Sequence, residues 1–340
     1  MIELYNLKKV IQNMKVGLNK KQRKELDENG FTIIEKILDD KTLEKISKAM
    51  DLIAKKILKY RGSKPGYIDG QFYGDGVKLR NCISHNENIL NLIDHPKILP
   101  LIVDAIGWNI QNGDSTFDYK FPISQETDPD KMSHGWHFDY EEEFEGTTLD
   151  GRMPLLDFKV GWYISDHTEF GHCTIMLVPG SFKWDKLQRN TWETWLDPKD
   201  IFELRVPAGS VMLWRPTLLH GVTQKFSNSI RKAIYISYCP RWIRPSSYLQ
   251  QDSKILSAST PIRRQLMGAM GDLSDPLGKD PIHSPSSQYW FSDNWDNVPL
   301  KAWSENKSFI NDNDLGLGKG ISHIKGPDYK FNKLRIPNNL

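Results

Sequence analysis

The stretch HGWHFDYE, residues 134–141, places two histidines, an aspartate and three aromatic residues within eight positions. In an extended strand, residues i and i+2 point to the same side, so His137 and Asp139 would present an imidazole and a carboxylate next to each other. Trp136 and Phe138 would then alternate onto the opposite, packed face. This pattern predicts two ligands of one metal ion, although H-x-D triplets also occur by chance and a solvated strand pair is the alternative.

His134 is the competing partner for this metal. Its i, i+3 spacing from His137 would suit a turn of helix, but Gly135 disfavours a helix there. The glycine beside it favours a loop position for His134, so we expect His137 to be the ligand.

A third ligand is expected from a later strand, and His220 is the candidate. It follows the strand-like run Ser210–Trp214 and the bend at Pro216, and Gly221 after it would leave room for a cavity. A core or surface histidine with satisfied hydrogen bonds is the alternative. Two histidines and one carboxylate with open positions are the ligand set of non-haem Fe(II) oxygenases.

Arg231 opens the next strand-like run, Lys232–Tyr238, after a turn at Asn228–Ser229. A guanidinium group matches a carboxylate with two parallel hydrogen bonds. A cavity with iron and one deep arginine would suit 2-oxoglutarate, which could chelate the metal at one end and meet Arg231 at the other. A surface salt bridge is the alternative role.

Composition restricts the class of protein. The 340 residues carry 45 basic and 43 acidic side chains, with no basic face that would track a phosphate backbone, so no nucleic-acid partner is expected. No apolar run is long enough for a membrane span and the N-terminus does not resemble a secretory signal, so we expect a cytoplasmic protein without a membrane partner. Cys82, Cys173 and Cys239 form no CxxC pair and are expected to be buried, reduced thiols. A small-molecule substrate and a monomer or homodimer are expected.

The hydrophobic pattern changes along the chain. Residues 18–60 are mostly helical in pattern, with a short strand at Phe31–Ile34 and a helix capped by Asp39 or Asp40. Residues 92–107 also have a helical pattern. From about residue 113, short β-rich segments are divided by turn residues, which is typical of an antiparallel core. The expected strands are Leu156–Ile164, Cys173–Val178, Phe202–Val206, Ser210–Trp214 and Lys232–Tyr238.

We therefore predict a mainly β fold, a double-stranded β-helix (a jelly roll, cupin-like) with flanking N-terminal α-helices. Residues 1–340 would form a single domain. Within it, 18–112 would be a mainly helical support, 113–245 the jelly-roll core, and 246–340 a loop-rich C-terminal extension.

Several segments, in order, resemble the phytanoyl-CoA dioxygenase (PhyH-type) family of Fe(II)/2-oxoglutarate oxygenases. The stretch LNKKQRKELDENGFTIIEKILDDKTLEKI is similar to the family's N-terminal helix and first strand, and HGWHFDYE to its W-H-x-D segment. GHCTIMLVPGSFKW resembles the strand ending in P-G-S-H-K, and PAGSVMLWRPTLLHGVTQKFSNSIRKAIYISYCP the distal block. Phe182 departs from the histidine of P-G-S-H-K, and Ser210 and Trp214 from the Asp and Phe of G-D-x-x-x-F.

The resemblance implies His137, Asp139 and His220 as the iron ligands and catalytic centre, with Arg231 as the anchor of 2-oxoglutarate. Thr174, Lys120 and Ser237 are further candidate contacts of the co-substrate. The implied requirements are Fe(II), 2-oxoglutarate and O₂, with stimulation by ascorbate.

The implied reaction is oxidation of an unactivated C–H bond of a small metabolite, by hydroxylation or by oxidative cyclisation or desaturation, with release of succinate and CO₂. Related halogenases carry Gly or Ala where this chain has Asp139, so halogenation is not implied. Two alternatives stay open: a cupin-like metal-binding or isomerase protein that does not use 2-oxoglutarate, and a family member with only a structural role.

The substrate is less well defined by the sequence. Acyl-CoA thioesters, amino acids, amines and terpenoids are all compatible, and we favour an amino-acid-derived compound of specialised metabolism. Arg241, Arg244, Arg263 and Arg264 would serve a CoA site, although surface solvation is their commoner role. The acidic run Glu141–Glu143 would be a solvated loop or a lid selecting an amine, and aromatic residues near Trp290 and Trp295 would line the pocket or pack in the core.

Overall fold

The structure is a computed structural model. It describes residues 16–60, 66–68, 71–73, 76–122, 134–141, 153–169, 171–223, 225, 227–269, 298–307 and 309.

A six-stranded antiparallel sheet forms the centre of the molecule, with the strand order β1-β9-β6-β11-β5-β4. Its strands are β1 (Phe31–Ile34), β4 (Gly76–Arg80), β5 (Ile110–Lys120), β6 (Phe158–Tyr163), β9 (Ser210–Trp214) and β11 (Arg231–Pro240). The sheet thus takes strands β1 and β4 from the stretch expected to be mainly helical. The two longest strands, β5 and β11, pair along their whole lengths, with an irregularity between Ser237 and Tyr238.

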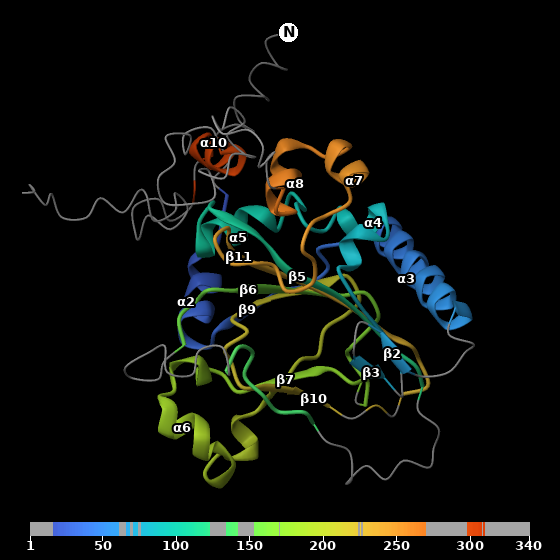
Figure 1. The fold of residues 1–340 in the computed structure, drawn as a ribbon. Coiled ribbons are helices and arrows are strands. Elements are labelled where there is room, and N and C mark those ends of the chain that lie inside the picture. Colours follow the sequence, from blue (N-terminus) through green and yellow to red (C-terminus); the bar gives the residue numbers. More distant parts are fainter. Residues whose placement is uncertain are drawn as a thin grey trace, which may run out of the picture.

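A smaller sheet faces this one, with the strand order β10-β7-β8 (Figure 1). It contains β7 (Ile175–Leu177), β8 (Phe202–Glu203) and β10 (His220–Val222). Buried side chains from β1, β6, β9 and β11 meet Ile175 and Leu177 of β7 in one apolar cluster between the layers. The double-layered antiparallel core confirms the predicted jelly-roll class. A hairpin of β2 (Gly66–Ile68) and β3 (Gln71–Tyr73) completes the described strands.

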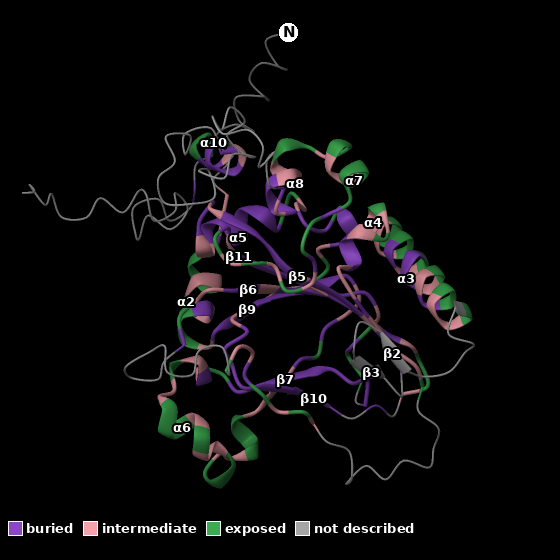
Figure 2. Ribbon diagram, viewed as in Figure 1, coloured by how far each residue is buried: buried purple, intermediate pink, exposed green. Residues whose placement is uncertain are grey.

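Helices cover the outer face of the large sheet (Figure 1). They are α3 (Asp40–Tyr60), α4 (Glu87–Leu90), α5 (Leu99–Ile106), α7 (Ser253–Ser257), α8 (Pro261–Leu266) and α10 (Pro299–Glu305), while α2 (Lys20–Glu28) flanks the sheet and α6 (Lys186–Thr191) lies beside the small sheet. The largest core cluster joins these helices to Phe117, Val160, Trp162, Ile234 and Ile236 of the sheet. In Figure 2, α3 shows green residues toward solvent between purple ones, as expected for an amphipathic helix on a core, and α5 is mostly purple, whereas α7 has no buried residue.

Local signals explain where the first elements begin and end. Asn19 and Gln22 form a capping box at the start of α2, and Gly30 has a φ of +85° after its end. Asp39 accepts a hydrogen bond from the backbone of Thr42 at the start of α3, which confirms an aspartate cap there. The strand predicted at Phe31–Ile34 is present as β1, and Ser210–Trp214 is present as β9.

The other predicted strands are present with different ends. The helix expected within residues 92–107 is shorter, since α5 begins at Leu99. In the part of the chain that the structure describes, no helix has the length and apolar character needed to cross a membrane.

The covered outer face predicts a large cost for truncating its central aromatic residue. Phe117 on β5 is fully buried, so Phe117→Ala should lower the free energy of unfolding by about 3–5 kcal/mol. Leu52→Ala, at an exposed position of α3, should change it by less than about 0.5 kcal/mol. Urea denaturation followed by circular dichroism would measure both, and equal effects would contradict the packing described here.

Candidate metal centre and its cavity

The backbones of His137 and His220 are directly paired, although 83 positions (220 − 137) separate them in sequence. His137 N–H donates to the His220 carbonyl at 2.9 Å, and His220 N–H donates to the His137 carbonyl at 3.0 Å. Two positions on, Asp139 N–H donates to the carbonyl of Pro216 at 3.1 Å. The pairing ties the end of the HGWHFDYE segment to β10.

The orientation of each imidazole ring is set by the backbone carbonyl two residues before it. Nδ1 of His137 lies 2.6 Å from the carbonyl oxygen of Gly135, and Nδ1 of His220 lies 2.8 Å from that of Leu218. Each Nε2 is therefore directed at Asp139, at 3.6 Å from its Oδ1 for His137 and 3.8 Å from its Oδ2 for His220.

The three side chains offer donor atoms that all lie within 4.8 Å of one another. Two neutral nitrogens and one carboxylate suit a divalent transition metal, and the backbone carbonyls at Nδ1 fix the tautomer that leaves Nε2 available.

Gly221 is needed for the approach of the two segments. A Cβ atom at this position would lie 2.7 Å from the carbonyl oxygen of His134 and 3.1 Å from the Trp136 ring. Glycine after His220 therefore allows the two segments to approach closely, which the sequence did not predict, and Gly221 also lines the cavity for which the sequence predicted room.

The charge states of His220 and Asp139 favour metal binding at neutral pH, whereas a metal ion at His137 competes with a proton. Burial lowers the pKa of His220 to about 4, so its imidazole is neutral. A hydrogen bond with Asp139 raises the pKa of His137. Burial alone would raise the pKa of Asp139, but the Lys159 ammonium and His137 together lower it, so this carboxylate is ionised.

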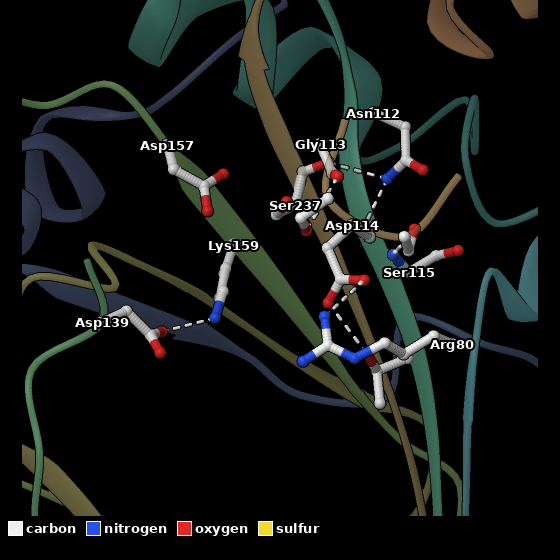
Figure 3. Close-up of polar contacts among 12 residues, drawn as sticks. Arg80, Asn112, Gly113, Asp114, Ser115, Asp139, Asp157, Lys159 and Ser237 are labelled. Carbon is white, nitrogen blue, oxygen red and sulfur yellow. Dashed lines mark hydrogen bonds and ion pairs between the residues drawn. The ribbon is translucent and has the colours of Figure 1, made fainter. Parts of the chain in front are cut away.

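Lys159 is the partner of Asp139. It lies on β6, is largely buried, and forms an ion pair with Asp139 Oδ2 (Figure 3). Asp157, two residues earlier, lies on the same side of the sheet. Its Oδ2 accepts a hydrogen bond of 2.5 Å from the hydroxyl of Tyr140, the residue after Asp139. Burial raises the pKa of Asp157 to about 6, against the lowering effect of Lys159.

Arg231 lines the same cavity as the three candidate ligands, a space of about 270 Å³. It is fully buried; its Nη1 donates to Asp118 Oδ2 at 2.5 Å and its Nη2 to the Tyr235 hydroxyl at 2.7 Å. A guanidinium has five N–H donors, so three remain, and Nε is buried without an acceptor among the described residues. Arg231 thus lies in the wall of the cavity that the metal candidate also lines, and it has N–H groups that no hydrogen bond among the described residues uses.

Strand register explains why so many charged side chains share this cavity. Residues opposite each other on adjacent strands face the same side. One row runs Lys78–Asp118–Ala233–Tyr163, the next Arg80–Thr116–Tyr235–Gly161, and the next Asp114–Ser237–Lys159. Arg80 and Asp114 form an ion pair at 3.9 Å (Figure 3). The inner face of the large sheet is therefore apolar near β1 and β9 but charged near β4, β5 and β11.

The remaining sequence candidates lie elsewhere. Thr174 is buried and its hydroxyl donates to the Leu204 carbonyl at 2.7 Å. Lys120 is paired opposite Arg231, and Ser237 lies between Asp114 and Lys159, but none of the three residues lines the cavity. His134 does line it, and its Nδ1 lies 2.9 Å from the Val222 carbonyl; it is in a loop, as expected, and does not belong to the three-residue ligand group.

Sequence reasoning missed Lys159, Asp118, Tyr235 and Asp157. The available signal was the alternation of polar residues within runs such as Asp114-x-Thr116-x-Asp118, which marks one face of a strand. Glu142, Glu143, Trp290 and Trp295 lie outside the described residues, so the expectations for the acidic lid and the aromatic lining remain untested.

A double-layered antiparallel fold that brings two histidines and an aspartate next to a buried arginine is typical of oxygenases that depend on Fe(II) and 2-oxoglutarate. The family model described as Phytanoyl-CoA dioxygenase (PhyH) matches residues 26–233, and the chain belongs to this family. It is accordingly an Fe(II)/2-oxoglutarate-dependent oxygenase, and Fe(II) and 2-oxoglutarate are the cofactor and co-substrate of the family.

Solved structures with a similar fold include HygX from Streptomyces hygroscopicus with iron bound, at 14% identity and a TM-score of 0.47, covering 66% of this chain and 87% of that one. Another is SnoK, a non-heme alpha ketoglutarate dependent carbocyclase from nogalamycin biosynthesis, at 18% identity and a TM-score of 0.49, covering 71% and 91%. HygX with nickel and 2-oxoglutarate bound matches at 15% identity and a TM-score of 0.46, covering 66% and 88%. Similarity at this level does not bear on the reaction of this chain.

The buried carboxyl of Asp157 predicts a pH-dependent difference between the protein and its Asp157→Asn variant. The folded-state pKa of about 6 exceeds the ordinary value of 3.8, so ionisation of Asp157 costs folding free energy as the pH rises. From about pH 4 to about pH 7, the wild type should lose stability relative to the variant, on the order of 3 kcal/mol. Asparagine keeps an acceptor for Tyr140. Urea titrations across this range would measure the difference, and a constant difference would show that the carboxyl is already ionised at pH 4.

Proposed function

We propose that this oxygenase oxidises an unactivated C–H bond of a small metabolite, with His137, Asp139 and His220 as the iron ligands and Arg231 as the anchor of 2-oxoglutarate. The observation that carries the proposal is the convergence of two Nε2 atoms and one carboxylate in the cavity that Arg231 also lines. Hydroxylation, oxidative cyclisation and desaturation all fit this centre, each with release of succinate and CO₂.

The donor set fits ferrous iron, which when bound supplies the activation of O₂ and the oxidation of the co-substrate. His137 and His220 would bind it through Nε2, because their Nδ1 atoms face backbone carbonyls. Lys159 holds one oxygen of Asp139, which favours a single metal contact through the other oxygen. Asp139 also occupies the position that related halogenases leave open, which supports oxygenation over halogenation.

Arg231 would bind the distal carboxylate of 2-oxoglutarate through its remaining N–H groups. Asp118 is a negative charge on the same guanidinium, and burial would raise its pKa, but Arg231 lowers it and keeps it ionised. Asp118 therefore orients the arginine and at the same time repels an incoming carboxylate. An isomerase or simple metal-binding protein of cupin type would need no such buried arginine, so this observation disfavours that alternative.

Metal binding tests the ligand assignment. His137→Ala and His220→Ala should each weaken Ni(II) binding by more than about 100-fold. This exceeds the loss of affinity that usually follows mutation of a residue that only hydrogen-bonds to a ligand. His134→Ala is the matched control, because His134 lines the same cavity and should change the affinity by less than about threefold. Isothermal titration calorimetry would measure all three. Loss of binding in His134→Ala with retention in His137→Ala would reverse the assignment.

Co-substrate kinetics test the anchor. With Fe(II) and ascorbate, the protein should form succinate from 2-oxoglutarate without a substrate, and Arg231→Ala should raise KM for 2-oxoglutarate by more than about 30-fold. Asp118→Asn removes the competing negative charge and should lower KM roughly three- to tenfold. Arg205→Ala is the control: Arg205 is half-exposed and does not line the cavity of Arg231, so its substitution should leave KM unchanged. Equal KM values for 2-oxoglutarate in Arg231→Ala and the wild type would show that Arg231 does not anchor the co-substrate.

A further inference from the structure

A second cavity, of about 350 Å³, lies next to the metal candidate and shares no lining residue with the cavity of Arg231. We refer to it as the Trp242 cavity; Tyr140, Leu156, Asp157, Trp242, Ile243 and Arg244 are among the residues that line it. Tyr140 follows the candidate ligand Asp139 in the chain, and Asp157 precedes Lys159 by two residues on one face of the sheet. Two lining residues of the Trp242 cavity are thus close chain neighbours of the Asp139–Lys159 ion pair, whose two side chains line the cavity of Arg231.

The walls of the Trp242 cavity are mainly apolar. Leu156 and Ile243 are half-buried, and Trp242 is 54% exposed, which is unusual for a large aromatic side chain in the described chain. An exposed indole beside a hollow provides a surface for the apolar body of a ligand. Arg244 is exposed at the same cavity.

Asp157 supplies the buried carboxyl group of this cavity. The residue is 6% exposed, its Oδ2 accepts the Tyr140 hydroxyl, and its Oδ1 is buried without a hydrogen bond of normal geometry among the described residues, although the Ser237 hydroxyl lies near enough to lower the pKa of this carboxyl. An unsatisfied buried carboxylate oxygen is costly, and a donor on a ligand would satisfy it. Tyr140 reaches Asp157 from a backbone with a φ of +64°, a conformation that non-glycine residues rarely adopt and that often occurs at ligand sites.

From this arrangement, and resting on the function proposed above, we infer that the Trp242 cavity binds the substrate, a compact and largely apolar molecule whose hydrogen-bond donor, an ammonium or hydroxyl group, binds Oδ1 of Asp157. The apolar body packs against Trp242, Leu156 and Ile243. A carboxylate in place of this donor is disfavoured. It cannot donate a hydrogen bond to Asp157, and the negative charges of Asp157 and the nearby Asp139 repel it. The C–H bond to be oxidised is then one near the donor group, on the part of the substrate that faces Asp139.

Three one-ring probes test this inference on the full, metal-free chain at pH 7.5: 2-phenylethylamine, 2-phenylethanol and 3-phenylpropionate. Titration calorimetry or ligand-observed NMR should show at least one donor probe binding about tenfold or more tightly than 3-phenylpropionate. The amine and alcohol arms identify which donor the cavity prefers. Equal binding of the carboxylate, or no measurable binding of either donor probe, would overturn the inference.

Two variants locate the binding to this cavity. Asp157→Asn replaces one acceptor oxygen by an amide that can donate, so the preference for the donor probe should fall by about fivefold or more. Trp242→Ala should weaken the binding of all three probes by a similar factor and leave the preference for the donor probes unchanged. Because Trp242 is exposed, this substitution should not disturb folding. Leu249→Ala is the control, since Leu249 is 72% exposed in the same segment and does not line the cavity. An unchanged preference in Asp157→Asn would refute the role of its carboxylate.

The experiments distinguish an error in the substrate site from an error in the proposed function. If the wild type forms succinate with Fe(II) and 2-oxoglutarate but discriminates none of the probes, only the substrate class is wrong. If the probes bind as expected but no succinate forms and Arg231→Ala binds 2-oxoglutarate as well as the wild type, the proposed function is wrong and the cavity stands.

Discussion

The pair of backbone hydrogen bonds between His137 and His220 is the constraint on which the rest of the site depends. It joins a segment between β5 and β6 to the short strand β10. The imidazoles are next to each other because their backbones are paired, and their ring centroids are 4.2 Å apart. Asp139 follows at the next same-side position and is held by Pro216 and Lys159. The geometry of the candidate ligands is therefore set mainly by backbone pairing and less by side-chain packing.

The second constraint is the presence of charged side chains on the inner face of the large sheet, whose outer face is apolar and covered by helices. Lys159, Arg231, Asp118 and Asp139 lie on or near the inner face, where an unpaired charge would be strongly disfavoured. Each is matched, Lys159 with Asp139 and Arg231 with Asp118. Such pairs add little to stability, since the cost of desolvation offsets their attraction, but they hold the side chains in defined directions.

Part of this arrangement could be predicted from the sequence. The H-x-D alternation, the run Ser210–Trp214 and the glycine after His220 are local signals, and each corresponds to the structure described here. The roles of Lys159, Asp118 and Asp157 could not be predicted in this way, because they depend on which strands are neighbours. β5 and β11 are paired across more than a hundred residues, and the irregularity at Ser237 and Tyr238 determines which residue of β5 faces which of β11. Without that register, alternating polar residues are indistinguishable from the solvent face of a sheet.

The two cavities have no lining residue in common, although Tyr140 and Asp157 of one are close in the chain to Asp139 and Lys159 of the other. The inner one is built from regular strands whose register cannot shift without loss of the whole sheet. The outer one is closed largely by the irregular segment after β11, which includes Trp242, Ile243 and Arg244. If the Trp242 cavity binds the substrate as inferred above, substitutions in that one loop would change selectivity without touching the strands that carry the candidate ligands, which makes the loop the natural target for engineering.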